Sequence, residues 1–227
     1  MEHYQITSLL GPEAESLLAH QCSKIPKDSI YQPSAAIIDD VFAYSDRSPV
    51  VLGNLQRLYH SGRLAGTGYI SIFPVDQAIE HTAAYSFYKN PAYFDPETIV
   101  RVAHEGGCNG VASTLGVLGL MSKKYADKIP FILKLNHNEL LTMPTKHNQI
   151  PFASVKQAKN LGAVGVGATI YFGSPESNQQ LVQVAQLFAE AHEQGLLTIL
   201  WCYPRNSAFT KDGQSYESAI DISAQAN

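Results

Sequence analysis

The sequence predicts an α/β protein, and we expect its parallel strands to belong to a (β/α)₈ barrel. Four candidate strands are nearly continuous apolar runs, which is the pattern of strands buried on both faces. Helix-like segments separate the strands, so that strand and helix alternate from about residue 68 onward. Polar residues follow the strands at Asp76, Asn136, Ser174 and Tyr203, and a barrel gathers its active site at that end of its strands.

The strands are expected in five places: 68-GYISIFPV-75, 110-GVAST-114, 131-FILKLN-136, 164-VGVGATIYF-172 and 197-LTILWCY-203. A helix is expected at 95–107, because an Asp and a Pro open this segment and glycines end it. A second helix is expected at 178–195, where apolar residues recur at helical spacing up to Gly195.

The first 65 residues have a different pattern, with Pro12, Pro26, Pro33 and Pro49 among them. We expect short helices and loops there, packed outside the main sheet. Since no Gly- or Ser-rich linker follows, we expect one domain overall. It would consist of an N-terminal helical extension (1–65) and the first five strand–helix units of a barrel (66–227).

An open, doubly wound sheet is the alternative fold. That fold has a glycine-rich phosphate loop after its first strand. The segment 74-PVDQAIEH-81 stands there instead, and this favours the barrel.

The composition excludes several classes of protein. Hydrophobic residues make up 45% and charged residues 16%, as in a folded globular protein. A net charge of −4 without a Lys/Arg cluster argues against a nucleic-acid partner. No apolar run approaches the ~20 residues of a membrane span, and the acidic N-terminus lacks the basic head of a signal peptide, so we expect a cytoplasmic protein. Three cysteines without a C-x-x-C pair argue against a disulfide framework or a structural zinc site.

Two places along the strands bring together groups suited to chemistry. Asp76, Glu80 and His81 follow the first strand, where carboxylates can orient a lysine, accept a proton or ligate a metal; the alternative is a solvated loop. Lys134 is surrounded by apolar strand residues, and burial lowers the pKa of an ammonium, which would make it a nucleophile or a tuned cation. The alternative is a lysine whose head pairs with a carboxylate at the strand end.

The fifth strand ends in a third candidate group. Trp201, Tyr203 and Arg205 alternate, so in an extended strand they share one face. An aromatic wall, a phenol and a guanidinium are suited to handling a phosphorylated substrate. The alternative is that Trp201 fills the core and Arg205 forms a surface ion pair. His137 and His147 match no known metal-ligand spacing, and Cys202 is interpreted as a packed thiol.

The four segments 66-GTGYISIFPVDQAIEH-81, 131-FILKLNHN-138, 165-GVGATIYFGSPES-177 and 199-ILWCYPRNSAF-209 resemble archaeal-type class I fructose-bisphosphate aldolases, especially longer bacterial members. The resemblance implies a (β/α)₈ barrel of the aldolase type that cleaves fructose 1,6-bisphosphate to dihydroxyacetone phosphate and glyceraldehyde 3-phosphate, in glycolysis and gluconeogenesis. It implies no metal and no other cofactor, a phosphorylated sugar as substrate, and a homo-oligomer at full length.

The resemblance also implies roles for single residues. Tyr203 matches the proton donor, Asp76 a catalytic residue of the first strand, and Lys134 an active-site lysine of the third strand. The residues expected to contact the substrate are Gln77, His81, Trp201 and Arg205. The Schiff-base lysine of these enzymes lies on the sixth strand, so we expect it beyond Asn227. A barrel cut after five units is expected to leave its first and fifth strands as open edges that do not meet.

Two alternatives to this function stay open. One is a related barrel of the aldolase superfamily that acts on another phosphorylated ketose. The other is an inactive fragment of a barrel.

Overall fold

The computed structural model describes residues 3–21, 25–77, 79–139, 146–205, 210–211 and 214–215. The chain forms two compact units, Met1–Ser34 and Ala35–Asn227. The first contains helix α1 (His3–Leu10), helix α2 (Ala14–Leu18) and the 3-10 turns Gly11–Glu13 and Lys27–Ser29. Residues 35–65 belong to the same unit as the sheet, and the expected division at residue 65 stays a prediction.

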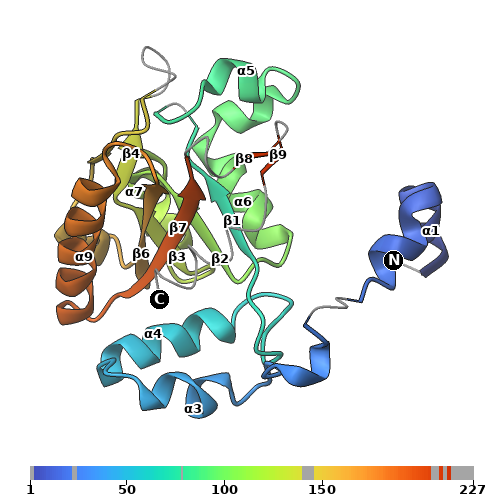
Figure 1. The fold of residues 1–227 in the computed structure, drawn as a ribbon. Helices are drawn as coiled ribbons and strands as arrows, with labels where there is room; N and C mark the ends of the chain where they lie inside the picture. Colours follow the sequence, from blue (N-terminus) through green and yellow to red (C-terminus); the bar gives the residue numbers. More distant parts are fainter. Residues whose placement is uncertain are drawn as a thin grey trace. The chain divides into compact units, whose positions relative to one another are not determined.

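The second unit is built on a parallel sheet that curls as part of a barrel does (Figure 1). Its strands, in spatial order, are β1 (Ile72–Val75), β2 (Gly110–Ser113), β3 (Phe131–Lys134), β6 (Gly165–Phe172) and β7 (Leu197–Pro204). Neighbouring strands pair in parallel throughout. Strands β1 and β7 lie at opposite edges of this sheet, which confirms the expected separation of the first and fifth strands.

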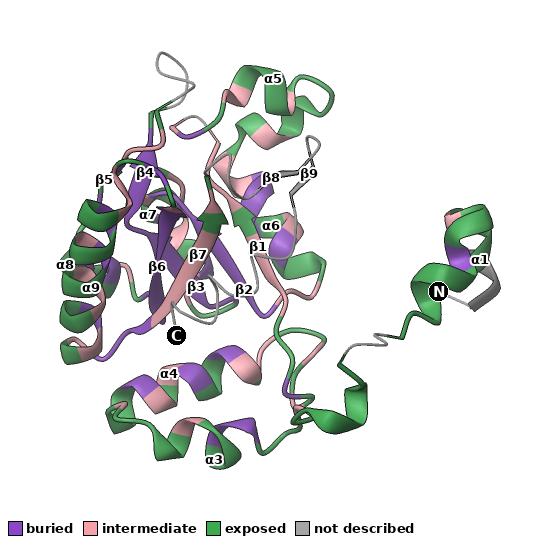
Figure 2. Ribbon diagram, viewed as in Figure 1, coloured by how far each residue is buried: buried purple, intermediate pink, exposed green. Residues whose placement is uncertain are grey.

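Helices follow the strands and cover the outer face of the sheet. They are α6 (Pro96–Glu105), α7 (Leu115–Tyr125), α8 (Val155–Asn160) and α9 (Ser177–Glu193). Asp95 caps α6 by accepting a hydrogen bond of 2.9 Å from the amide of Glu97. Outward-facing Val111, Leu133 and Val166 pack against these helices in the largest apolar cluster. Strands β2, β3 and β6 are buried, whereas the edge strands β1 and β7 are mostly of intermediate burial (Figure 2). Both helices expected from the sequence, at 95–107 and 178–195, are therefore confirmed.

Two helices from the N-terminal side of the chain pack at the amino ends of the strands, against the inner face of the sheet (Figure 1). They are α3 (Ile37–Asp40) and α4 (Pro49–Tyr59), with a 3-10 turn (Phe42–Tyr44) between them. Ile38, Leu55 and Leu58 pack against Ala112 and Ile132 of the inner face. The inner face is thus filled with apolar side chains near the start of the strands, which leaves the carboxyl ends of the strands for the site.

A buried asparagine joins α4 to the start of β1. Asn109 is fully buried, and its Nδ2 donates to the carbonyls of Leu58 (3.1 Å) and Ser61 (2.7 Å). Its Oδ1 accepts a hydrogen bond of 2.8 Å from the amide of Ser71. Every polar group of this side chain is satisfied, so the contact fixes the approach of the chain to β1.

Two strands differ from their predicted bounds by more than one residue. The first begins at Ile72, not at residue 68, because Gly66 and Gly68 adopt φ values of +73° and +78° that belong to turns. The third ends at Lys134, and the chain continues as β4 (Asn136–Asn138), which pairs antiparallel with β5 (Gln149–Pro151). This hairpin brings a distant part of the chain to the carboxyl end of β3.

The remaining described elements are short. They are α5 (Ala83–Phe87), a 3-10 helix (Pro91–Phe94), and the two-stranded ribbon of β8 (Thr210–Lys211) and β9 (Gln214–Ser215). Residues 216–227 lie outside the described part of the chain. Among the helices that the structure does describe, none has the length and apolar character to cross a membrane.

Candidate active site

A pocket of about 390 Å³ opens at the carboxyl ends of the strands. The structure brings all the predicted site residues to its wall, although they come from three different strand ends: Asp76, Gln77, His81, Lys134, Trp201, Tyr203 and Arg205. A concave site with several converging polar groups at this end of a barrel sheet is the usual place for a substrate. The roles of the individual residues stay predictions.

Lys134 is held by two carboxylates. Alternation along β3 turns Leu133 and Leu135 to the outer face and Lys134 to the inner face. The buried Nζ donates a hydrogen bond of 2.6 Å to Asp76 Oδ2 and forms a second ion pair with Glu80 Oε2. Lys134 therefore does pair with carboxylates, and this pairing occurs inside the pocket.

Glu80 is the centre of this network. It is 3% exposed, and its Oε1 accepts hydrogen bonds of 2.6 Å from both Gln149 Nε2 and Tyr171 Oη. Burial opposes ionisation of Glu80, yet His137, the Lys134 ammonium and the Tyr171 hydroxyl outweigh it and hold the pKa of the Glu80 carboxyl far below its usual range. Burial, together with the same hydrogen bond to Glu80, raises the pKa of Tyr171. Glu80 is thus a fixed anion.

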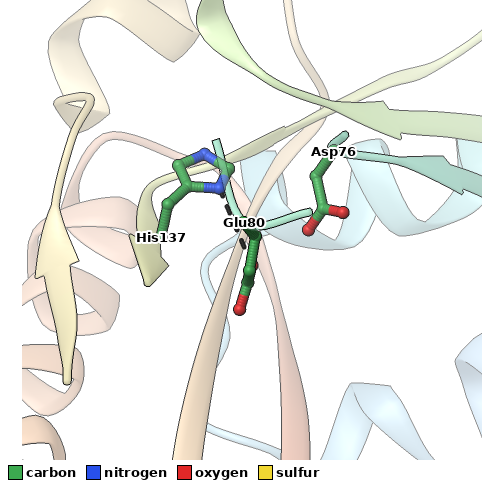
Figure 3. A group of neighbouring side chains, drawn as sticks. All are labelled: Asp76, Glu80 and His137. Atoms are coloured by element: carbon green, nitrogen blue, oxygen red, sulfur yellow. Dashed lines mark ion pairs between the residues drawn. The ribbon is translucent and has the colours of Figure 1, made fainter. Parts of the chain in front are cut away.

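Figure 3 shows Glu80 between Asp76 and His137. The three side chains offer donor atoms within 4.8 Å of one another, a spacing at which a metal ion can be held. The Lys134 ammonium, however, already lies against both carboxylates. His137 is buried, its Nδ1 is 3.8 Å from Glu80 Oε2, and its ring meets Phe152 edge-on. The cluster is therefore better matched to the lysine than to a metal ion.

Trp201 and Tyr203 of β7 and Arg205, which directly follows this strand, all line the pocket, as their alternation predicts. The Trp201 ring lies against Gly167 of β6, where a Cβ atom would come within 2.0 Å of the ring. The Arg205 guanidinium carbon lies 5.0 Å from the centre of the Tyr203 ring and 5.2 Å from that of Tyr171. The arginine is thus supported by two aromatic rings and faces the pocket.

The sequence pattern gives no site role to His147, Gln149 or Tyr171, although all three belong to the site. Tyr171 stands on the same face of β6 as Thr169, two residues before it, and the strand's alternation could have identified it. Gln149 and His147 reach the site through the β4–β5 hairpin, for which the sequence gives no such signal. The His147 ring meets Tyr171 edge-on, with ring centres 5.0 Å apart, and burial and Arg205 lower the pKa of His147.

Three other residues that the sequence singles out, Asn136, Ser174 and Cys202, are not part of the pocket wall. Asn136 exchanges hydrogen bonds of 2.9 and 2.8 Å with the backbone of Thr169 and so ties the chain after β3 to β6. Ser174 is buried and is not part of the pocket wall. Cys202 is half-buried on the opposite face of β7 from Trp201, and burial raises the pKa of its thiol, which agrees with a packed cysteine.

Comparisons with known proteins agree with this geometry. A family model described as "DeoC/LacD family aldolase" matches residues 70–226. Over 222 residues the chain is 55% identical to a probable fructose-bisphosphate aldolase class 1 of Chlamydia muridarum, a match that covers 98% of this chain and 63% of that protein. Over 168 residues it is 32% identical to a fructose-bisphosphate aldolase/6-deoxy-5-ketofructose 1-phosphate synthase of Methanocaldococcus jannaschii, which covers 70% of this chain and 54% of that protein.

A solved structure is similar as well. An archaeal fructose-1,6-bisphosphate aldolase, with its catalytic lysine covalently bound to the carbinolamine intermediate of the substrate, superposes with a TM-score of 0.61 and 31% identity, covering 76% of this chain and 64% of that one. The chain thus spans less than two thirds of the length of these relatives. The family match nevertheless includes the whole parallel sheet and every predicted site residue, and the chain belongs to the DeoC/LacD family of aldolases.

Proposed function

We propose that the protein acts as a class I, Schiff-base-forming fructose-bisphosphate aldolase, which reversibly cleaves fructose 1,6-bisphosphate to dihydroxyacetone phosphate and glyceraldehyde 3-phosphate. One observation carries the proposal: Tyr203, the Lys134–Asp76 pair and Arg205 all face one pocket of about 390 Å³. The names of the relatives from Chlamydia muridarum and Methanocaldococcus jannaschii support the same substrate.

The reaction needs an electron sink and a proton carrier. Cleavage of the C3–C4 bond leaves an electron pair on C3, and a protonated imine at C2 accepts this pair as an enamine, which a neutral ketone does poorly. Tyr203 is 40% exposed at the pocket, so its phenol can reach a substrate hydroxyl. In this proposal Tyr203 takes the proton from the C4 hydroxyl and returns one to the enamine carbon.

Lys134 is assigned the role of an electrostatic helper. An amine that attacks a carbonyl needs a free lone pair, whereas Lys134 would first have to give up its proton and its ion pairs with Asp76 and Glu80. The buried ammonium is suited instead to hold Asp76, whose carboxylate lies at the pocket wall. In this proposal the imine forms on another lysine, which we expect on a strand that follows β7.

Arg205 is assigned to a phosphate or hydroxyl group of the substrate. Its guanidinium lies over the Tyr203 and Tyr171 rings, which restricts its motion before a ligand binds. A guanidinium presents paired donors that fit phosphate oxygens. The same proposal includes a place in glycolysis and gluconeogenesis, a cytoplasmic location and a homo-oligomer.

The test has a binding arm and a turnover arm. Trp201 is the one tryptophan of the sequence and lies in the pocket wall, so its fluorescence reports ligands there. We expect fructose 1,6-bisphosphate to change this fluorescence saturably in the 227-residue chain. Turnover is measured in the chain extended with the part of the Chlamydia muridarum relative beyond the match, by coupling triose phosphate release to NADH oxidation.

The alternative substrates enter the same assays. Turnover of another ketose phosphate, without turnover of fructose 1,6-bisphosphate, would favour the related-barrel function over the proposed one. An extended chain that is folded but neither binds nor cleaves any ketose phosphate would contradict the proposal.

A further inference from the structure

We infer that Tyr171 is a positioning residue that fixes both halves of the site: its hydroxyl holds Glu80 against Lys134, and its ring supports Tyr203 and Arg205. This inference rests on the proposed function, because it gives a role to a residue in the site of that reaction.

The Tyr171 hydroxyl binds the oxygen of Glu80 that Lys134 does not use. Tyr171 Oη and Gln149 Nε2 each donate a hydrogen bond of 2.6 Å to Glu80 Oε1. Oε2 is thereby left to Lys134, and the Glu80 side chain has one arrangement that satisfies all three donors. Asp76 lacks such partners among the described residues other than Lys134, and its side chain is 25% exposed. The two carboxylates therefore differ: Glu80 anchors the lysine, and Asp76 remains open to a ligand.

The ring of Tyr171 contacts three other residues of the pocket wall. The Tyr203 ring centre is 5.9 Å away, and the Arg205 guanidinium carbon is 5.2 Å from the centre of the Tyr171 ring. His147 adds an edge-on contact at 5.0 Å. A shift of this ring would therefore move the phenol assigned to proton transfer and the guanidinium assigned to phosphate.

The backbone of Tyr171 is anchored from outside the site. Its amide donates a hydrogen bond of 2.9 Å to Oε1 of Gln180, a fully buried residue of α9. Gln180 Nε2 in turn donates to the carbonyl of His147 at 2.7 Å. Tyr171 itself is 4% exposed and its proton is committed to Glu80, so it is suited to hold other groups and not to exchange protons with a substrate.

The first test measures the restraint on Lys134 in the 227-residue chain. The acylation rate of each lysine is followed by mass spectrometry in the wild-type protein and in Tyr171→Phe, which removes the hydroxyl and keeps the ring. Loss of one hydrogen bond to a charged group is expected to speed labelling of Lys134 about tenfold or more, while the other lysines keep their rates.

A matched control is available in Tyr125. This tyrosine is also buried, at 6% exposure, and its hydroxyl lies 3.1 Å from a carboxylate oxygen of Glu97, outside the pocket. Tyr125→Phe is expected to leave labelling of Lys134 unchanged. Equal rates for Lys134 in Tyr171→Phe and in the wild type would overturn the hydroxyl part of the inference.

The second test measures how much the Tyr171 ring contributes to ligand binding. Fructose 1,6-bisphosphate is titrated against Trp201 fluorescence in the wild type, Tyr171→Phe and Tyr171→Leu. We expect Tyr171→Phe to keep the dissociation constant within about twofold. Tyr171→Leu is expected to raise the dissociation constant about tenfold, because it removes the aromatic and cation–π contacts of the ring. Wild-type affinity in a folded Tyr171→Leu would overturn the ring part.

The two tests separate failure of the inference from failure of the proposed function. A wild-type chain that gives no Trp201 response to the sugar bisphosphate counts against the proposed function. Labelling of Lys134 needs no ligand, so it still decides whether Tyr171 restrains the lysine. If Tyr171→Leu does not fold, labelling of Lys134 in Tyr171→Phe still decides whether the Tyr171 hydroxyl restrains the lysine.

Discussion

Replacing Glu80 by glutamine would remove one charge from the buried centre of the site and leave its shape nearly unchanged. All donors around Glu80 point at its two oxygens: Gln149 and Tyr171 at Oε1, and Lys134 at Oε2. A glutamine amide has one oxygen and one NH₂ group, so in either orientation the NH₂ group faces a donor. Either Lys134 or the two donors Gln149 and Tyr171 therefore lose their acceptor, and Asp76 is the charged partner that Lys134 keeps.

The magnitude follows from the burial of the pair. Breaking a buried ion pair by removing one partner costs about 3–5 kcal/mol. Because Asp76 still pairs with Lys134, we expect the lower end, a loss of about 3 kcal/mol in the free energy of unfolding. That is a large share of the ~5–15 kcal/mol typical of a domain.

The pH dependence of this loss has a definite sign. The pKa of Glu80 is lower in the folded protein than its ordinary value of 4.5. A carboxyl with a lowered pKa stabilises the fold above its unfolded value, and this stabilisation is lost as the pH falls through the folded value. The difference between wild type and Glu80→Gln should therefore be constant above about pH 5 and should shrink in acid.

Urea unfolding followed by circular dichroism at neutral pH and at about pH 3 measures both effects. The matched control is Glu97→Gln, since Glu97 also accepts from a lysine and a tyrosine, Lys124 and Tyr125, but at the surface. We expect Glu97→Gln to change the free energy of unfolding much less. If Glu80→Gln were no more destabilising than this control, the account of Glu80 as a fixed buried anion would be refuted.

Three further substitutions test other parts of the site. In the extended chain, Tyr203→Phe should lower kcat about 10²–10⁴-fold, as expected for a positioned proton carrier, with little change in ligand binding by Trp201 fluorescence; near-normal kcat would exclude Tyr203 from proton transfer. Arg205→Lys should raise the dissociation constant for the sugar bisphosphate about tenfold, since lysine lacks the planar paired donors, and an unchanged constant would count against a phosphate contact. Gly167→Ala should shift Trp201 emission and destabilise the fold by about 1–3 kcal/mol, because its Cβ would come within 2.0 Å of the ring. Gly119→Ala in α7, where nothing lies within 4 Å, should do neither.

The residues that could be predicted from the sequence are those fixed by strand alternation and strand ends. The apolar strand neighbours of Lys134 are enough to predict its place in the site. The alternation of Trp201, Tyr203 and Arg205 predicts that they share one face, without any knowledge of their partners. Asp76 follows the first strand directly, which placed it at the pocket. These positions depend on local geometry that a strand imposes on its own residues.

The parts that could not be predicted depend on contacts between distant segments. Glu80 was expected at the mouth among solvated or catalytic carboxylates, but Gln149 and Tyr171 surround it and make it a buried anion. Gln149 arrives through a hairpin whose strands pair across the 139–148 connection, and no periodicity marks such a residue. The start of β1 was placed too early, because the glycine turns before Ile72 are set by their positive φ angles and not by hydrophobicity.

In the proposed mechanism, Lys134 assists an imine that forms on another lysine. Borohydride reduction in the presence of dihydroxyacetone phosphate traps an imine permanently, and peptide mass spectrometry then locates the modified lysine. We predict that the extended chain gains one adduct on a lysine after β7, that Tyr203→Phe still gains it, and that the 227-residue chain gains none. An adduct on Lys134 in either form would contradict the account, because an ammonium held by Asp76 and Glu80 would then be the nucleophile.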